Sequence, residues 1–370
     1  MERLPQNIRG ILEGLIEDLK SRESVISIGL FGSWSRGEAT SSSDVDLLIV
    51  DGRNLSYEYV ERAEIDGTFL DLDYVPEKWV LRDFPPEIDQ KIYEAEILYD
   101  SNGTLERAKN TMLKIMWLPE RVEIRTGDYI VKADTLLSRG LSAYGREDYQ
   151  SAKLNAMLGL ETIMKIIIEI SKIPFSNSHY IRALEASARK LDLKDLYDEY
   201  LEITGLSKVN RKEAERIFKA FVDMWSTVID MVEANSSAIK GLHEEIINNL
   251  NFYCKLSFLR GITARTRSLL NEGSFVEAAH YMLRSSVDML ENYAWLLARI
   301  EGTQFDYTHL IGYLKNSKVS PSLVYENAVE VLMVKDVSLE DANFSLEKAR
   351  NIILDTRQKR KELIAHMSTH

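Results

Sequence analysis

The sequence of 370 residues has a single cysteine, Cys254, and no histidine before His179. One cysteine excludes an internal disulfide and a zinc site built from several thiolates, which is usual for proteins of a reducing compartment. No run approaches the roughly 18 uninterrupted apolar residues of a membrane span, and the opening segment alternates charged with apolar residues, unlike a secretion signal. We therefore expect a cytoplasmic protein without membrane contact. Any chemistry before His179 has to proceed without imidazole.

Charge is unevenly distributed along the chain. Residues 1–104 contain 22 acidic and 10 basic residues, whereas the remaining residues contain 36 of each. Such an acidic segment repels the phosphate backbone of nucleic acids, which argues against a basic polyanion-binding surface there. Clustered carboxylates instead suit hard divalent cations such as Mg²⁺.

Apolar periodicity divides the chain into an α/β part and a helical part. Residues 6–20 have helical spacing, and the β-rich runs that predict strands are residues 24–31, 44–50, 68–75 and 95–99. From about residue 104 onward only long helical patterns follow. We expect an α+β protein with a short mixed sheet and helices in residues 1–104, followed by two helical bundles at 105–240 and 241–370.

The two expected bundles resemble each other. The stretch that begins at Tyr149 is similar to the one that begins at Phe275, and His179 and His309 fall at matching places. A duplicated domain is one interpretation, and chance similarity between amphipathic helices is the other. The matched histidines indicate shared packing rather than a metal site, because no ligand spacing accompanies them. The long helices also leave open a homodimer formed through the bundles.

The residues that suggest chemistry begin with the run Gly32-Ser33-Trp34-Ser35-Arg36-Gly37, which is followed by Asp44 and Asp46. Because strand side chains alternate, the carboxylates of Asp44 and Asp46 are expected on one face of a strand. Asp71 and Asp73 repeat this spacing on a later strand. If the two strands are neighbours, three carboxylates converge without histidine, which suits a two-metal phosphoryl- or nucleotidyl-transfer site.

The glycine-flanked turn supplies a complementary anion site. Gly32 and Gly37 allow the backbone N–H groups to approach phosphate oxygens, and Ser33 adds a hydroxyl. Glu38 and Ala39 follow where a Walker loop has Lys and Ser or Thr, and no Gly-x-Gly-x-x-Gly follows a strand here. The pattern therefore excludes a P-loop ATPase and a Rossmann dehydrogenase.

The stretch FGSWSRGEATSSSDVDLLIV resembles the signature of nucleotidyltransferases of the DNA polymerase β superfamily: a Gly-Ser turn, an Arg-Gly pair and an Asp-x-Asp strand. Within this superfamily it is most similar to the minimal nucleotidyltransferase (MNT) branch, whose domains often end with a strand similar to AEILYD and a turn similar to SNG. The resemblance covers about residues 24–103. Trp34 and Ser35 depart from it, because smaller or aromatic-then-Ala pairs are frequent at those places.

The resemblance implies roles for these residues. Nucleotide phosphates would be bound by Gly32, Ser33, Arg36 and Gly37. Of these, Gly32 and Ser33 would hold the β and γ phosphates of a nucleoside triphosphate. Asp44 and Asp46 would bind two Mg²⁺ ions. A carboxylate on the third strand would bind the catalytic metal and help to deprotonate the acceptor hydroxyl. Asp71 fits that position best, and Asp73 is the alternative.

The helical part is similar to two kinds of bundle that accompany such domains. One is the substrate-binding bundle of aminoglycoside nucleotidyltransferases, and the other is the HEPN bundle often encoded beside minimal nucleotidyltransferases. HEPN ribonucleases carry an Arg followed after four to six residues by His, a spacing that Arg360 and His366 match. A solvated helix end is the competing interpretation of this pair, and a charged helix face is that of the basic run at residues 357–361.

We therefore expect a Mg²⁺-dependent nucleotidyltransferase that moves NMP, with ATP as the expected donor, to a hydroxyl of a small molecule, a protein or an RNA end. Pyrophosphate is the expected second product. Two alternatives remain open at this point. The first is a non-catalytic nucleotide-binding or toxin–antitoxin-like regulator, and the second is a HEPN-type ribonuclease in the C-terminal bundle.

Overall fold

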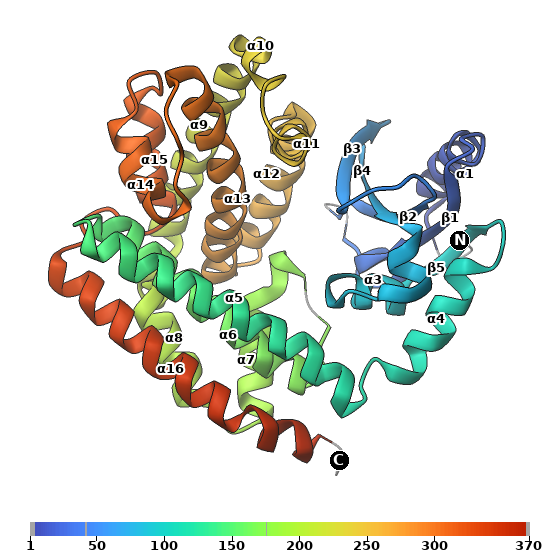
Figure 1. The fold of residues 1–370 in the computed structure, drawn as a ribbon, viewed down its shortest axis with the longest axis horizontal. Helices are drawn as coiled ribbons and strands as arrows, with labels where there is room; N and C mark the ends of the chain where they lie inside the picture. The colour runs from blue at the N-terminus through green and yellow to red at the C-terminus, as the bar shows by residue number, and fades with distance from the viewer. Residues whose placement is uncertain (1–3, 41–42, 175, 368–370) are drawn as a thin grey trace. The chain divides into compact units, whose positions relative to one another are not determined.

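The computed structural model describes residues 4–40, 43–174 and 176–367 and contains two compact units (Figure 1). The first unit comprises Met1–Arg121 together with Lys255–Arg265, and the second comprises Val122–Cys254 and Thr266–His370. The first unit thus includes a short segment from far downstream. The two expected helical bundles fall almost entirely within the second unit, and a further division of that unit near residue 240 stays a prediction.

The first unit is built around a five-stranded mixed sheet with the strand order β3-β4-β2-β1-β5. Strand β2 pairs in parallel with β4, whereas the other neighbouring pairs are antiparallel. The strands are β1 (Val25–Phe31), β2 (Val45–Asp51), β3 (Tyr59–Ile65), β4 (Thr68–Pro76) and β5 (Glu96–Asp100). The helical elements are α1 (Gln6–Lys20), α2 (Gly32–Arg36), η1 (Trp79–Asp83), η2 (Pro86–Ile88), α3 (Asp89–Glu94) and α4 (Thr104–Ile115).

The two faces of this sheet carry separate apolar cores. Leu47 and Ile49 of β2 lie in a core with buried residues of α1, whereas Leu48 and Val50 lie in the core formed with α3 and α4. This division follows from the alternation of side chains along a strand. By the same alternation, Asp46 belongs to the face that α3 and α4 cover.

The sequence predicted most of the first unit. Helix α1 and strands β1, β2, β4 and β5 lie within a residue of their expected ranges, which confirms the α+β class. The sequence did not predict strand β3. Its residues YVERAEI include three charged residues and only two β-branched ones, so the run lacks a strong strand pattern. The expected turn after β1 is a single helical turn, α2. Asp44 precedes β2 rather than lying within it, so the expectation that it shares a strand with Asp46 was wrong by one residue.

The described residues of the second unit form helices joined by turns and loops, without strands. Its helices, with those that begin or end in the first unit, are α5 (Pro119–Gly145), α6 (Tyr149–Ile170), α7 (Tyr180–Lys190), α8 (Lys194–Thr204), α9 (Arg211–Ala234), α10 (Ser236–Ile239), α11 (Glu244–Tyr253), α12 (Leu256–Asn271), α13 (Phe275–Glu301), α14 (Leu310–Asn316), α15 (Ser322–Val331) and α16 (Leu339–His366). Three 3₁₀ turns join them, η3 (Asn177–His179), η4 (Leu206–Lys208) and η5 (Tyr307–His309). Helix α6 begins at Tyr149, where the first of the two similar stretches begins, and is buried on almost every side.

The similar stretches around α6 and α13 have the same order of elements. Each consists of a long helix, a 3₁₀ turn that ends in histidine, and a shorter helix, α7 or α14. The start of α7 is capped by the second stretch. The backbone N–H groups of Ile181 and Arg182 donate to the two carboxylate oxygens of Glu277, in the first turn of α13, at 2.8 Å each.

The start of α14 is capped by the first stretch in the same way. The N–H of Ile311 donates to the Ser151 hydroxyl at 2.9 Å, and the N–H of Gly312 donates to the Asp148 carboxylate at 3.2 Å. Ser151 and Glu277 occupy matching places at the beginnings of α6 and α13. The two stretches therefore exchange equivalent contacts, which favours the interpretation as a duplicated unit.

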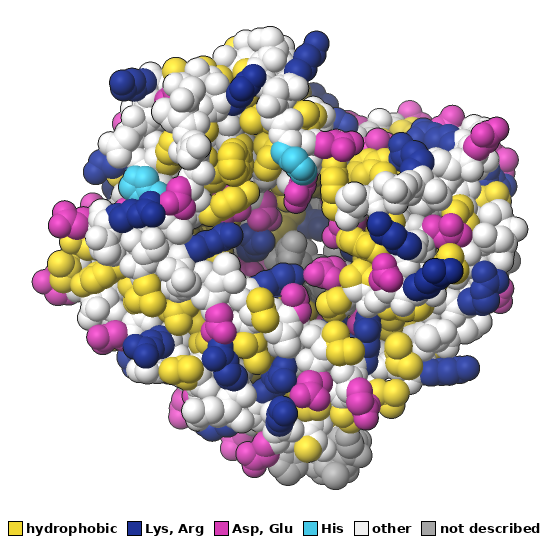
Figure 2. Space-filling model, in the orientation of Figure 1, with side chains coloured by type: hydrophobic (Ala, Val, Ile, Leu, Met, Phe, Trp, Pro, Cys, Tyr) yellow, Lys and Arg dark blue, Asp and Glu magenta, His cyan; other side chains and the backbone are white. Residues whose placement is uncertain are grey.

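Acidic and basic side chains are interspersed over the helical elements on the face shown in Figure 2, rather than separated into large patches. This pattern agrees with the equal numbers of acidic and basic residues after residue 104. None of the helices in the described ranges is long and apolar enough to cross a membrane.

Candidate active site

Strands β2 and β4 bring two of the predicted carboxylates together. Asp46 and Asp71 are direct partners in the parallel pairing, and Asp73 lies two residues further along β4 beside Leu48. Paired residues on adjacent strands point to the same face, so Asp46, Asp71 and Asp73 share the face covered by α3 and α4. The expected convergence of carboxylates from two neighbouring strands is thus present for these residues.

The proximity of these carboxylates changes their proton affinity. The pKa of Asp46 is raised well above its ordinary value, because the group is removed from water and lies near the charges of Asp71 and Asp73. Burial likewise raises the pKa of Asp71 to about 6, with Arg62 opposing the shift and Asp73 adding to it. Negative charge is therefore incompletely balanced at this place, which is typical of functional sites.

Asp73 has a different environment from Asp71. Its carboxylate lies 2.9 Å from the ammonium of Lys91 on α3, which also donates to Glu58 at 2.9 Å. Burial disfavours the charge of Lys91, but Asp73 and Glu58 outweigh it and raise the pKa of this group. Because Asp71 is in register with Asp46 and Asp73 is neutralised by lysine, the geometry favours Asp71 as the third carboxylate.

Asp44 is held by two arginines. Its carboxylate forms ion pairs with Arg62 on β3 and with Arg265 on α12, one oxygen to each. Nε of Arg62 also lies 3.5 Å from Oδ1 of Asp71. The guanidinium of Arg62 is therefore placed between Asp44 and Asp71. The sequence indicated neither arginine, because β3 was not predicted and Arg265 lies in the helical part of the chain.

The glycine-flanked turn lies directly beside Asp46. Gly32 has φ of 73°, and a Cβ atom at this position would collide with the Asp46 carboxylate. Only glycine combines this backbone conformation with so close an approach. Ser33 and Arg36 lie on α2, and Gly37 ends this helix in the left-handed conformation with φ of 75°. Trp34 packs against the core on the α1 side of the sheet, so the unusual residue anchors the turn.

The turn already holds an anionic group. The N–H of Gly32 donates to the Glu94 carboxylate at 3.1 Å, and Nη1 of Arg36 lies 2.6 Å from the same oxygen. Glu94 is at the end of α3, and its side chain is only 5% exposed. The backbone amide and the guanidinium thus form a place where negative oxygen is stabilised, as the resemblance to nucleotidyltransferases implies for a phosphate.

The donor chemistry at this place suits Mg²⁺. Among the described residues, no group of three or more His, Cys, Asp or Glu side chains is placed so that it could hold a metal ion. Asp46 and Asp71 nevertheless offer hard oxygen ligands, and Oδ1 of Asp71 is buried without a hydrogen-bond partner in the described structure. The residues therefore fit the ion, although the set Asp44, Asp46 and Asp71 stays a prediction.

The ribonuclease candidates lie at the end of α16. Arg360 donates to the backbone oxygen of Glu123 at 3.2 Å and to the hydroxyl of Thr126 at 3.4 Å, both on α5. These contacts give Arg360 a packing role between helices. The side chain of His366 lies outside the described residues, so ribonuclease chemistry by this pair stays a prediction.

The second unit contains a buried charged cluster that the sequence did not reveal. Glu161 of α6 lies 3.5 Å from Nε2 of His280 and 3.6 Å from the charged nitrogens of both Lys165 and Arg284. Burial alone would raise the pKa of Glu161, but the hydrogen bond from His280 and the charges of Lys165 and Arg284 lower it. This buried carboxylate is therefore fully compensated.

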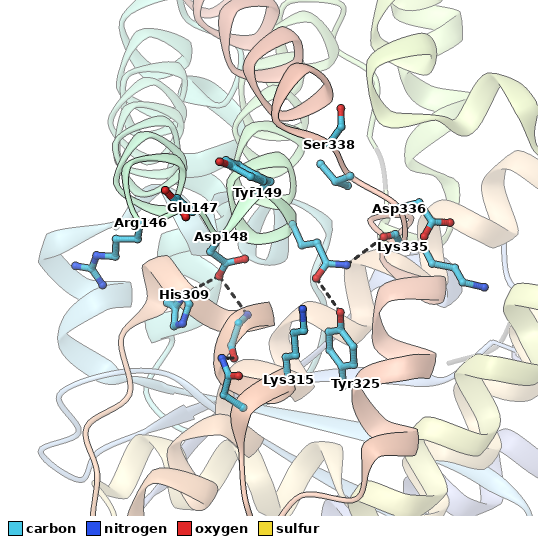
Figure 3. Close-up of a pocket in the computed structure, with 14 residues that line it drawn as sticks. Arg146, Glu147, Asp148, Tyr149, His309, Lys315, Tyr325, Lys335, Asp336 and Ser338 are labelled. Atoms are coloured by element: carbon cyan, nitrogen blue, oxygen red, sulfur yellow. Dashed lines mark hydrogen bonds and ion pairs between the residues drawn. The ribbon is translucent and has the colours of Figure 1, made fainter.

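A pocket of about 590 Å³ in the second unit is lined by residues of both similar stretches (Figure 3). Nδ1 of His309 lies 2.6 Å from the Asp148 carboxylate, which also caps α6 by accepting from the N–H of Ser151 at 3.1 Å. Lys315 and Tyr325 lie on the opposite side of the pocket from Tyr149. Asp148 thus joins the beginning of α6 to α14, and the imidazole of His309 lies against its carboxylate.

Comparison with known proteins defines the class of the first unit. Residues 12–122 match the family model described as "Nucleotidyltransferase domain", so this part of the chain carries a domain of that type. The matched range contains Gly32, Asp44, Asp46 and Asp71.

Among solved structures, the chain is similar to a nucleotidyltransferase-like protein from Exiguobacterium sibiricum 255-15, with 12% identity over 87% of each chain and a TM-score of 0.33. At this identity and TM-score, the likeness carries no conclusion about the chemistry. No curated protein matches the chain.

Proposed function

We propose that the first unit is a Mg²⁺-dependent nucleotidyltransferase of the minimal nucleotidyltransferase branch. It transfers NMP from a nucleoside triphosphate, with ATP as the expected donor, to a hydroxyl group and releases pyrophosphate. The observation that carries this proposal is the register of Asp46 with Asp71 beside the Gly32 turn, within a nucleotidyltransferase-type domain.

The residues at this place divide the chemistry between them. The oxygen of the acceptor hydroxyl attacks the α-phosphorus, the bond from that phosphorus to the pyrophosphate oxygen breaks, and the hydroxyl proton passes to Asp71. A pKa of about 6 makes Asp71 a stronger base than an ordinary aspartate while leaving it ionised at neutral pH. The amide of Gly32, the hydroxyl of Ser33 and the guanidinium of Arg36 orient the phosphates, with Gly37 ending the turn.

Asp44, Asp46 and Asp71, with Asp73 as the alternative third ligand, would hold two Mg²⁺ ions. When bound, these ions supply positive charge to the triphosphate and lower the pKa of the acceptor hydroxyl. The acceptor class is a hydroxyl of a small molecule, a protein or an RNA end. We propose that the helical unit, which resembles aminoglycoside nucleotidyltransferase and HEPN bundles, selects among these.

The test is transfer from α-labelled nucleoside triphosphates, supplied one base at a time with Mg²⁺ and a cell extract as the source of acceptors. We expect label transfer and pyrophosphate release by the full chain. Asp46→Asn and Asp71→Asn should lose at least about a thousandfold in rate, because each removes a charge used at the transition state. Asp66→Asn is the matched control, since Asp66 is exposed at the β3–β4 turn.

The assay also separates transfer from regulation. If the wild type binds a triphosphate but never releases pyrophosphate with any base, the transferase proposal is refuted and the non-catalytic regulator is favoured. If both site variants retain the wild-type rate, the assignment of Asp46 and Asp71 is wrong.

A further inference from the structure

The first unit contains a helical segment that comes from far along the chain. This segment is Lys255–Arg265, and most of it is the first part of α12. The ammonium of Lys255 donates to the backbone oxygen of Arg62 at 3.1 Å, and the ring of Phe258 lies 4.9 Å from the Arg62 guanidinium carbon. The segment is therefore seated on strand β3 at the position of Arg62.

The fit between this segment and the sheet is close. A Cβ atom at Gly261 would lie 3.0 Å from Nη2 of Arg62 and 3.4 Å from the ring of Phe69. Arg62 is enclosed between Phe69 and Phe258, and its side chain is only 2% exposed. This enclosure fixes the guanidinium beside the carboxylates, because a charged group so deeply buried requires an anionic partner.

Both arginines point at the groups that the proposed function assigns to Mg²⁺. Arg62 is shared between Asp44 and Asp71, whereas Arg265 pairs with the other oxygen of Asp44. The Arg265 side chain is 23% exposed, so it can leave its partner at lower cost than Arg62. The two cations thus satisfy Asp44 without any metal.

We propose that Arg265 is a positioning residue that holds Asp44 as an internal counter-ion and weakens divalent-cation binding until it is displaced. This inference rests on the proposed function. Cations that share one carboxylate compete for it, so the ion pair and the metal oppose each other in the same binding equilibrium. Arg265, which lies 221 residues beyond Asp44 in the sequence, therefore sets the metal affinity of the acidic site, while Arg62 keeps Asp44 and Asp71 together.

The experiment measures Mn²⁺ binding to the full chain without nucleotide, from the electron paramagnetic resonance signal of free Mn²⁺. Arg265→Gln should lower the dissociation constant about tenfold, because loss of a cation within a few ångströms strengthens the site for another. Arg265→Lys, which keeps the charge, should stay near the wild type. Arg260→Gln is the matched control, because Arg260 lies on the same helix, is 59% exposed and faces Glu64 at 3.6 Å.

A second measurement needs no substitution. Saturating Mn²⁺ should speed amide hydrogen exchange across residues 256–265 of the wild type, because binding removes a contact that holds this segment. If exchange there is unchanged, or if Arg265→Gln binds Mn²⁺ no more tightly than Arg260→Gln, the inference is overturned.

The outcomes distinguish this inference from the proposed function. Asp46→Asn should abolish saturable Mn²⁺ binding in every background. Binding that depends on Asp46 but ignores Arg265 refutes the counter-ion alone and leaves the transferase proposal standing. Absence of saturable binding in the wild type and in all variants refutes the counter-ion inference, whereas label transfer and pyrophosphate release decide the transferase proposal.

Discussion

Buried carboxylates occur in both units, and their surroundings are opposite. In the helical unit, Glu161 is placed among Lys165, His280 and Arg284, and its pKa is lowered. In the sheet unit, Asp46 and Asp71 are partners on neighbouring strands, and the pKa values of both carboxylates are raised. A fully compensated carboxylate stabilises the packing of helices. Carboxylates with excess negative charge instead attract a cation.

Chemistry in this chain is expected where neighbouring buried carboxylates keep excess negative charge. The neighbours of Glu161 compensate its charge, whereas Asp46 and Asp71 keep excess negative charge beside an anion-holding turn. Natural proteins accept such destabilising arrangements mainly where function requires them. Four substitutions test these environments through their effects on stability.

The largest expected effect is on stability, from Glu161→Gln. Removing this carboxylate leaves Lys165 without its nearest anion, while Arg284 keeps its ion pair with Asp288, so the free energy of unfolding should fall by about 3 kcal/mol at pH 7. The pKa of Glu161 is below its ordinary value, so the contribution is present above about pH 4.5 and is lost on further acidification. Urea denaturation compares it with Asp71→Asn, which should leave stability unchanged or higher. Equal losses in the two variants would contradict the contrast.

The next effect concerns the close approach of Gly32 to Asp46. Gly32→Ala should lower the free energy of unfolding by about 2 to 3 kcal/mol, because the left-handed backbone is strained and the methyl group displaces the carboxylate. Gly67→Ala has the same backbone strain, with φ of 74°, but its methyl group meets no described atom within 4 Å. It should lose only about 1 kcal/mol in thermal or urea unfolding. An identical loss at both glycines would show that Asp46 is not pressed against the turn.

A smaller effect separates the two similar stretches of the helical unit. Asp148→Ala removes the cap of α6 and the acceptor for the Gly312 amide, so it should lower the free energy of unfolding by about 2 kcal/mol. Ser274 stands at the matching place before α13, where no side-chain cap bond occurs in the described structure. Ser274→Ala should therefore be nearly neutral. Chemical denaturation of both variants checks the difference, and a loss at Ser274 would contradict it.

The smallest effect depends on pH. Burial and the nearby charge of Asp288 raise the pKa of Glu291 to about 7, against the opposing charges of Arg139 and Arg284. The native state then binds a proton more tightly than the unfolded state, so stability falls as pH rises from about 4.5 to 7. Glu291→Gln should gain about 1 to 2 kcal/mol over the wild type at pH 8 and nothing at pH 4. A gain that is the same at both pH values would refute the shift.

Local patterns in the sequence specify the class of fold and predict the kind of chemistry. Alternating apolar residues specify β1, β2, β4 and β5, and helical periodicity specifies α1, α6 and α13, because these patterns are local. The Gly32 turn and the Asp-x-Asp spacing are also local, so they could be found without coordinates. The sequence therefore identifies Asp46 without coordinates and leaves Asp71 and Asp73 as alternatives for the third carboxylate.

Only the tertiary structure decided which groups those carboxylates meet. The parallel register of β2 with β4 pairs Asp46 with Asp71 and leaves Asp73 to Lys91, a choice that spacing along one strand cannot make. The arginines on Asp44 come from an edge strand with weak strand character and from a helix more than 200 residues away. Contacts between segments so distant depend on packing and charge in three dimensions, and no local pattern encodes them.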